Sequence, residues 1–136
     1  MNVLVVEPGY LPYEKEIDDL PDMKKLVGGP IQAIYPFREP VALVCNEEAH
    51  HQRAEFNRAI PERSYGGIFG TFFVCGLGEE SFISLTPEQV NTYRERFRNA
   101  EILVTMIGPT PVVLEVAPKV KRRPGGAKGP PKPRTR

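Results

Sequence analysis

Apolar runs broken by glycine and proline recur along the chain, and they predict a fold rich in strands. Their β-branched and aromatic residues suit the pleated surface of a sheet. The runs cover residues 1–6, 31–37, 41–46, 68–74, 82–84, 102–107 and 112–116, with a further short extended piece within 13–17. We expect 31–37 and 41–46 to form a hairpin, and 102–107 with 112–116 to form a second hairpin or a strand pair that extends the sheet.

A first helix is predicted over residues 20–27. Leu20, Met23 and Val27 fall on one face at helical spacing, and Pro21 suits the first turn, where its missing N–H would be unpaired anyway. Gly28 follows the last periodic residue and can adopt the left-handed conformation that ends many helices.

The second predicted helix, over residues 87–98, has the clearest local signal in the chain. Thr86 is placed as the N-cap, with Pro87 at the first helical position and Gln89 at the third, which is a capping box. Leu85 and Val90 flank this cap as a hydrophobic staple. We therefore expect this helix to begin at a defined residue.

These elements predict an α+β fold with a mostly antiparallel sheet and two helices packed on one face. Residues 47–60 are polar and predict a weakly helical surface segment. Residues 1–117 are expected to form a single domain, and 118–136 a disordered basic tail rich in proline and glycine.

Charge divides the chain at the same place. Residues 118–136 hold eight of the 18 basic residues and no acid, which leaves ten basic against 17 acidic residues and a formal charge of −7 in residues 1–117. The basic residues of the tail are Lys119, Lys121, Arg122, Arg123, Lys128, Lys132, Arg134 and Arg136. They would attract phosphates, so the tail is a candidate nucleic-acid-binding segment; the alternative is an end that folds back on the acidic body or has no role.

The acidic body has two interpretations as well. Glu7, Tyr10, Tyr13, Glu14 and Glu16, together with the acidic surface, could mimic nucleic acid or contact a basic partner. Mild acidity also keeps small domains soluble, and we favour this second interpretation.

Three groups of residues invite a chemical interpretation, and a structural one is favoured for each. Residues 76–81 (GLGEES) resemble a phosphate loop, but the expected strand that follows favours a hairpin turn. A second group could form a metal site, but we favour a solvated polar segment: Cys45, Glu47, Glu48, His50 and His51. Cys45 and Cys75 lie in apolar runs, where a free cysteine packs as a small hydrophobe unless a base such as His50 activates it. We therefore expect no catalytic residue, metal or cofactor.

The apolar runs are too short to cross a bilayer, which takes about 20 residues. No signal peptide is recognised, and two unpatterned cysteines suit a reducing compartment. We expect a cytoplasmic protein without a membrane partner.

Six segments in series (VLVVEPG, LVGGPIQAIYPF, VALVCNEE, FNRAI, GTFFVCG and SLTPEQV) are similar to an uncharacterised family of small proteins. The family is associated with phages, plasmids and conjugative elements of Gram-positive bacteria. The resemblance covers residues 2–98 and implies an accessory protein of a mobile element in the cytoplasm of the bacterial host cell.

The function expected on these grounds is that of a non-enzymatic phage or mobile-element accessory protein. It would bind a host protein, nucleoprotein complex or other macromolecule, and inhibition of a host defence system is one form that this could take. The alternative is a nucleic-acid-binding module that acts through the tail. A third hypothesis is a small enzyme or ligand-binding domain with a site near Cys75, Cys45 and His50.

Overall fold

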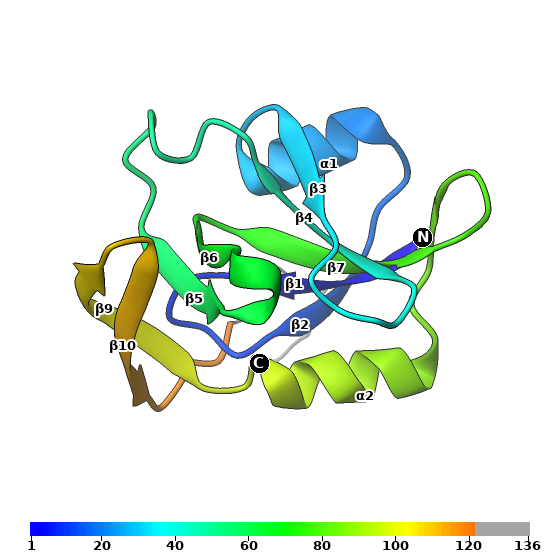
Figure 1. The fold of residues 1–136 in the computed structure, drawn as a ribbon. Helices are drawn as coiled ribbons and strands as arrows, with labels where there is room; N and C mark the ends of the chain where they lie inside the picture. Colours follow the sequence, from blue (N-terminus) through cyan, green and yellow to red (C-terminus); the bar gives the residue numbers. More distant parts are fainter. Residues whose placement is uncertain (122–136) are drawn as a thin grey trace, which may run out of the picture.

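Ten strands and two α-helices form within residues 1–121, the part of the chain that the computed structural model describes (Figure 1). The elements are β1 (Asn2–Val6), β2 (Tyr13–Glu16), α1 (Leu20–Val27), β3 (Ile31–Ile34), β4 (Val41–Asn46), β5 (Phe56–Ile60), the 3-10 turn η1 (Glu62–Ser64), β6 (Gly66–Phe69), β7 (Phe72–Leu77), β8 (Phe82–Ile83), α2 (Pro87–Arg96), β9 (Ala100–Ile107) and β10 (Thr110–Val116). The predicted α+β class, with a mostly antiparallel sheet and two helices, is confirmed.

The central sheet has six strands in the order β2-β1-β7-β4-β3, and β8 pairs with the end of β7. Its strand pairs are antiparallel. β3 and β4 form the predicted hairpin, with Ile31 opposite Asn46. Strand β7 lies at the centre because it pairs with β1 on one side and β4 on the other. The sequence run around residues 66–77 is therefore the middle of the fold.

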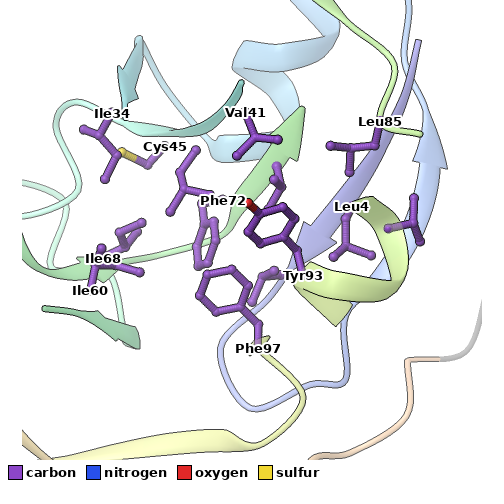
Figure 2. Close-up of a cluster of buried hydrophobic side chains, with 14 residues drawn as sticks. Leu4, Ile34, Val41, Cys45, Ile60, Ile68, Phe72, Leu85, Tyr93 and Phe97 are labelled. Carbon is purple, nitrogen blue, oxygen red and sulfur yellow. The ribbon is translucent and has the colours of Figure 1, made fainter. Parts of the chain in front are cut away.

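The two helices cover opposite faces of this sheet, so the prediction that both pack on one face is wrong. Leu4, Leu43 and Phe72 point to the face that α2 covers, through Leu85, Val90, Tyr93 and Phe97 (Figure 2). The alternate residues Val3, Val44 and Phe73 point to the face that α1 covers, through Met23 and Val27.

The physical reason lies in the three inner strands. β1, β4 and β7 are buried along almost their whole length. Successive side chains of a strand point to opposite faces, so an apolar residue at every position requires a cover on both sides. Full burial of a Val, Leu or Phe side chain stabilises the fold by roughly 1.5–3 kcal/mol. Each helix buries such side chains on one face of the sheet.

Both helices begin where the local sequence predicts, and α1 also ends as predicted, whereas α2 ends at Arg96, two residues before the predicted end. The Asp19 side chain accepts a hydrogen bond from the Asp22 backbone N–H at the start of α1, and Gly28 ends it with a φ of 89°. In α2 the capping box is complete: Thr86 Oγ1 accepts from the Gln89 N–H, and Gln89 Oε1 accepts from the Thr86 N–H.

Two stretches of the chain fold differently from the prediction. The expected strand at residues 68–74 is two strands, β6 and β7, because the chain bends at Gly70, whose φ of 81° is left-handed. Residues 47–60, predicted as a polar surface segment, end in the buried strand β5, which pairs with β6. Asn57 and Arg58 are fully buried there, although their polarity indicated a surface position.

Hydrogen bonds to backbone carbonyls explain this burial. Arg58 donates to the carbonyl oxygens of Phe97, Asn57 and Tyr10 at 2.9–3.3 Å. Asn57 donates to the carbonyl oxygens of Val6 and Gly70 at 2.9 Å. Polar groups can be buried at low cost when each finds such a partner.

β9 and β10 form a hairpin at one end of the molecule, as predicted, but they make a separate two-stranded sheet and do not extend the central one (Figure 1). Residues 118–121, which the sequence assigns to the tail, contact the body. Lys119 forms a β-bridge with Tyr10: the Leu11 N–H donates to the Lys119 carbonyl oxygen at 2.8 Å, and the Lys119 N–H donates to the Gly9 carbonyl oxygen at 3.0 Å. The Lys121 side chain forms an ion pair with Glu7 at 3.2 Å. Within residues 1–121, no helix is long and apolar enough to cross a membrane.

Candidate functional site

Cys45 and Cys75 lie on opposite faces of the central sheet, so the two cysteines and His50 cannot all belong to one site. Cys45 points to the face of α2 and Cys75 to the face of α1. Burial raises the pKa of the Cys45 thiol to about 11 and that of Cys75 to about 12. Because the thiolate is the reactive form, both cysteines are poor nucleophiles at neutral pH.

His50 lies in the turn after β4, with its ring centroid 4.7 Å from that of Phe69. It lines a small pocket of about 160 Å³ together with Cys45. Across residues 1–121, no group of three histidine, cysteine or carboxylate side chains is arranged to hold a metal ion, and the cluster at residues 45–51 is no exception.

The glycine-rich segment at residues 76–81 is a hairpin turn, as predicted. Gly76 pairs with Ile83 and Leu77 with Phe82, which joins β7 to β8. The turn leads into a strand, so it has no helix N-terminus with which to bind a phosphate.

Each predicted acidic contact residue of the N-terminal segment already has a partner in the body. Glu7 accepts hydrogen bonds from Tyr13 and Lys121, and Glu14 accepts them from Asn2 and Arg94. The Glu16 carboxylate contacts the Met1 amino group at 2.7 Å. These carboxylates therefore stabilise the fold locally.

Of the eight predicted tail cations, Lys119 and Lys121 lie against the body. Lys121 also places its ammonium nitrogen 5.3 Å from the centre of the Tyr10 ring. The other six, Arg122, Arg123, Lys128, Lys132, Arg134 and Arg136, lie outside the described residues.

An open groove of about 620 Å³ lies at the Met1 end of the sheet. Four segments build it: the start of β1, the loop into α1 with its first turns, strand β3 with the residues after it, and the β7–β8 turn. Apolar side chains form its floor, among them Leu20, Met23, Ile31, Tyr35, Leu77 and Phe82. Leu20 and Tyr35 are almost half exposed, so the floor offers apolar surface to a ligand.

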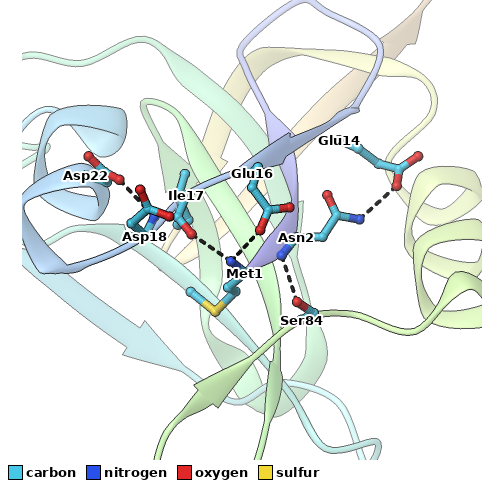
Figure 3. Close-up of polar contacts among 8 residues, drawn as sticks. All are labelled: Met1, Asn2, Glu14, Glu16, Ile17, Asp18, Asp22 and Ser84. Atoms are coloured by element: carbon cyan, nitrogen blue, oxygen red, sulfur yellow. Dashed lines mark hydrogen bonds and ion pairs between the residues drawn. The ribbon is translucent and has the colours of Figure 1, made fainter.

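Three carboxylates, Asp18, Glu79 and Glu80, line this groove, and its lining contains no lysine, arginine or histidine. One positive group lies nearby, the Met1 amino group, but it is held by Glu16 and by the Ile17 carbonyl oxygen at 2.8 Å (Figure 3). The groove therefore has an apolar floor and a negative rim.

Local hydrogen bonds hold the loop that carries Asp18. The Asp18 N–H donates to the Asp22 carboxylate at 2.8 Å (Figure 3). The Asp22 N–H donates in turn to the Asp19 carboxylate. On the facing side, the β7–β8 hairpin holds Glu79 and Glu80 at its exposed tip. The rim is thus built on two fixed turns.

Sequence reasoning missed this groove. It recognised Glu79 and Glu80 as the tip of a turn and Leu20 as part of a helix face, without a relation between them. No local sequence pattern marks the groove, because the exposure of the large side chains Leu20 and Tyr35 becomes visible only after folding.

The fold and the groove define a small α+β domain whose antiparallel sheet is covered on both faces. A sequence model of the family described as "Domain of unknown function (DUF3846)" matches residues 1–98, so the chain belongs to this family. The match includes the residues that line the groove and ends before the β9–β10 hairpin. Comparisons with the curated proteins and with the solved structures gave no match.

Proposed function

We propose that this protein is a non-enzymatic binding module that docks a basic, partly apolar segment of another protein in the groove at the Met1 end. The observation that carries this proposal is the combination of an exposed apolar floor with a rim of Asp18, Glu79 and Glu80.

Each part of the groove selects one property of the partner. An apolar side chain of the partner that covers the exposed floor removes it from water, and this lowers the free energy of the complex. The rim attracts lysine and arginine, raises the rate of encounter and disfavours acidic partners. A nucleic acid would be repelled by the same carboxylates, so a protein segment fits the groove better.

The absence of catalysis is part of the proposal. Its support is that the two thiols are buried with raised pKa values and lie on opposite faces of the sheet. The setting that we propose is a phage or mobile element in the bacterial cytoplasm, with a host protein as the partner and interference with host defence as its use. The support for this setting is the resemblance of the six sequence segments.

The proposal is tested by affinity capture from a host lysate with two charge-reversed proteins. Glu79→Lys with Glu80→Lys reverses the rim of the groove. Glu47→Lys with Glu48→Lys is the matched control, because these two adjacent glutamates are also exposed in a turn but lie outside the groove. We expect the wild type and the control to capture the same protein and the groove variant to lose it.

Two outcomes would overturn the proposal. One is that the wild-type protein captures nothing above background. The other is that both variants lose the partner equally, which would show that net charge, and not the groove, is responsible.

A second candidate function is nucleic-acid binding through the tail. It is favoured by the eight cations without an acid in residues 118–136, and by the anchoring of Lys121 to Glu7, which places the start of this segment on the body. Fluorescence anisotropy with labelled DNA and RNA over a salt series tests it.

The comparison protein is the full chain with its six cations beyond Lys121 replaced by glutamine. If the tail binds phosphates, this protein should lose both affinity and most of the salt dependence, since each phosphate contact contributes about 0.7 to 0.9 to the slope. Unchanged affinity would exclude the tail as the binding segment.

A further inference from the structure

Six of the eleven large apolar side chains that are exposed within residues 1–121 belong to the β9–β10 hairpin. Its inner side rests on β5, where Glu101 accepts a hydrogen bond from the Ala59 N–H at 2.8 Å. On its outer side the cross-strand pair Ile102 and Leu114 is 53% and 57% exposed. We define the hairpin patch as Ile102, Val104, Ile107, Val112 and Leu114; Met106, which is opposite Pro111 and next to Ile107, points to the inner side.

The patch also lacks charge. From residue 102 to residue 114 the chain has no Asp, Glu, Lys, Arg or His, although a quarter of all residues are charged. Charged residues return at both ends of this stretch, with Glu101 before it and Glu115 after it. Monomeric proteins rarely expose a continuous apolar area larger than a few hundred Å², so this surface indicates an interface.

Two other occupants fit the patch poorly. Residues 122–136 of this chain contain no valine, leucine, isoleucine, methionine or aromatic residue, so they offer few side chains that could pack on the patch. A nucleic acid would find no cation on the patch to neutralise its phosphates.

We propose that the occupant is a second copy of this chain, with the two hairpin patches packed face to face about a two-fold axis. An isologous contact brings identical surfaces together, and an uncharged patch is self-complementary in this arrangement. Elsewhere the body of residues 1–117 carries a formal charge of −7, so two copies repel each other least where they meet through the hairpin.

The area available predicts a reversible dimer. With about half of each side chain exposed, five aliphatic residues offer on the order of 400 Å², and two copies would bury roughly 800 Å², below the range of stable specific interfaces. Dimerisation should therefore depend on concentration. The groove and the hairpin lie at opposite ends of the molecule, so this proposal does not depend on the groove (Figure 1).

The test is the mass of the full chain in solution, measured by sedimentation or light scattering over a range of about 1 to 200 µM. We expect the mass to rise from 15.3 kDa toward twice this value. Leu114→Glu should stay monomeric throughout, and so should the milder Leu114→Thr, which keeps strand propensity if the charged variant fails to fold. Val120→Glu is the control: Val120 is 74% exposed outside the patch, so this variant should dimerise like the wild type.

A cross-linking measurement tests the geometry. Thr105→Cys places a thiol opposite Val112 on the hairpin, whereas Thr92→Cys places one on the exposed side of α2. Mild oxidation should link two chains through the first variant and not through the second. A wild-type chain that remains monomeric at the highest concentration, or Leu114 and Val120 variants that behave alike, would overturn the proposal.

Discussion

Arg58 donates two hydrogen bonds to the carbonyl oxygen of Phe97, from Nε at 3.3 Å and from Nη2 at 2.9 Å. Phe97 is the C-cap of α2, so strand β5 holds the end of the helix through a guanidinium with no exposed surface. Burial lowers the pKa of Arg58, and the charge of Glu101 opposes this change. A positive charge at a helix C-terminus is also favourable to the helix dipole.

Replacing this guanidinium should be among the most damaging single changes in the body. In Arg58→Met the carbonyl oxygens of Phe97 and Tyr10 lose their donor. We expect the free energy of unfolding to fall by about 2–4 kcal/mol, because each buried unsatisfied group costs about 1–3 kcal/mol. Urea denaturation followed by circular dichroism measures it.

The matched control is Arg38→Met, in which the same substitution is made at an exposed arginine. It should change the stability by no more than about 0.5 kcal/mol. Equal effects of the two substitutions would refute the role assigned to Arg58.

The cap of α2 allows a test within one helix. Thr86→Ala removes the side-chain acceptor of the Gln89 N–H and should cost about 1 kcal/mol. Thr92→Ala, at an exposed position in the middle of the same helix, should be neutral or slightly stabilising, because alanine has the higher helix propensity. Thermal denaturation of both variants distinguishes a cap effect from a general effect of losing threonine.

The protein should lose stability at alkaline pH. Cys45 and Cys75 have pKa values raised by burial from 9.0 to about 11 and about 12. Tyr93 has a pKa raised by burial and by its hydrogen bond to Glu39, and so acts in the same direction.

In the unfolded chain the thiols lose their protons above pH 9.0, while in the folded chain they keep them. Stability is therefore complete below this value and is lost as the pH rises toward the folded pKa values. The two thiols should together cost about 3 kcal/mol between about pH 8 and about pH 10. A variant with both cysteines replaced by alanine should show a flatter profile, and a wild-type profile as flat as that of the variant would contradict the prediction.

The bend between β6 and β7 should require glycine. Gly70 has a φ of 81°, and an added Cβ would lie 3.2 Å from the Ala54 Cβ. Gly70→Ala should cost about 1–2 kcal/mol from the backbone strain, and more if Ala54 cannot move. Gly108→Ala, with a φ of 60° and open space around the added Cβ, should show the strain alone. A smaller loss for Gly70→Ala than for Gly108→Ala would rule out a crowded bend.

The family relationship was accessible from the sequence, because ordered segments over residues 2–98 resemble the family whose match covers residues 1–98. The groove was not accessible. Asp18 and Glu79 lie 61 positions apart, and nothing near either residue indicates that the two turns face one groove.

The interpretation of residues 56–60 shows the same limit. Asn57 and Arg58 give this stretch the polarity of a surface segment, yet it is a buried strand. The carbonyl groups that make this possible belong to Val6, Tyr10, Gly70 and Phe97. Because these hydrogen-bond acceptors are distant in sequence, no pattern within residues 56–60 indicates them.

By itself, the sequence determined both helices, their caps, the β3–β4 and β9–β10 hairpins and the turn at residues 76–81. Each of these depends on hydrogen bonds and side-chain spacing within a few residues, and such interactions are encoded locally. Only the tertiary structure decided which face of the sheet each helix covers, how Arg58 is buried, and where the groove and the hairpin patch lie. These features depend on groups that the burial of apolar surface brings together from distant parts of the chain. The hydrophobic effect is not directional, so the sequence of one segment does not say which other segment it will pack against.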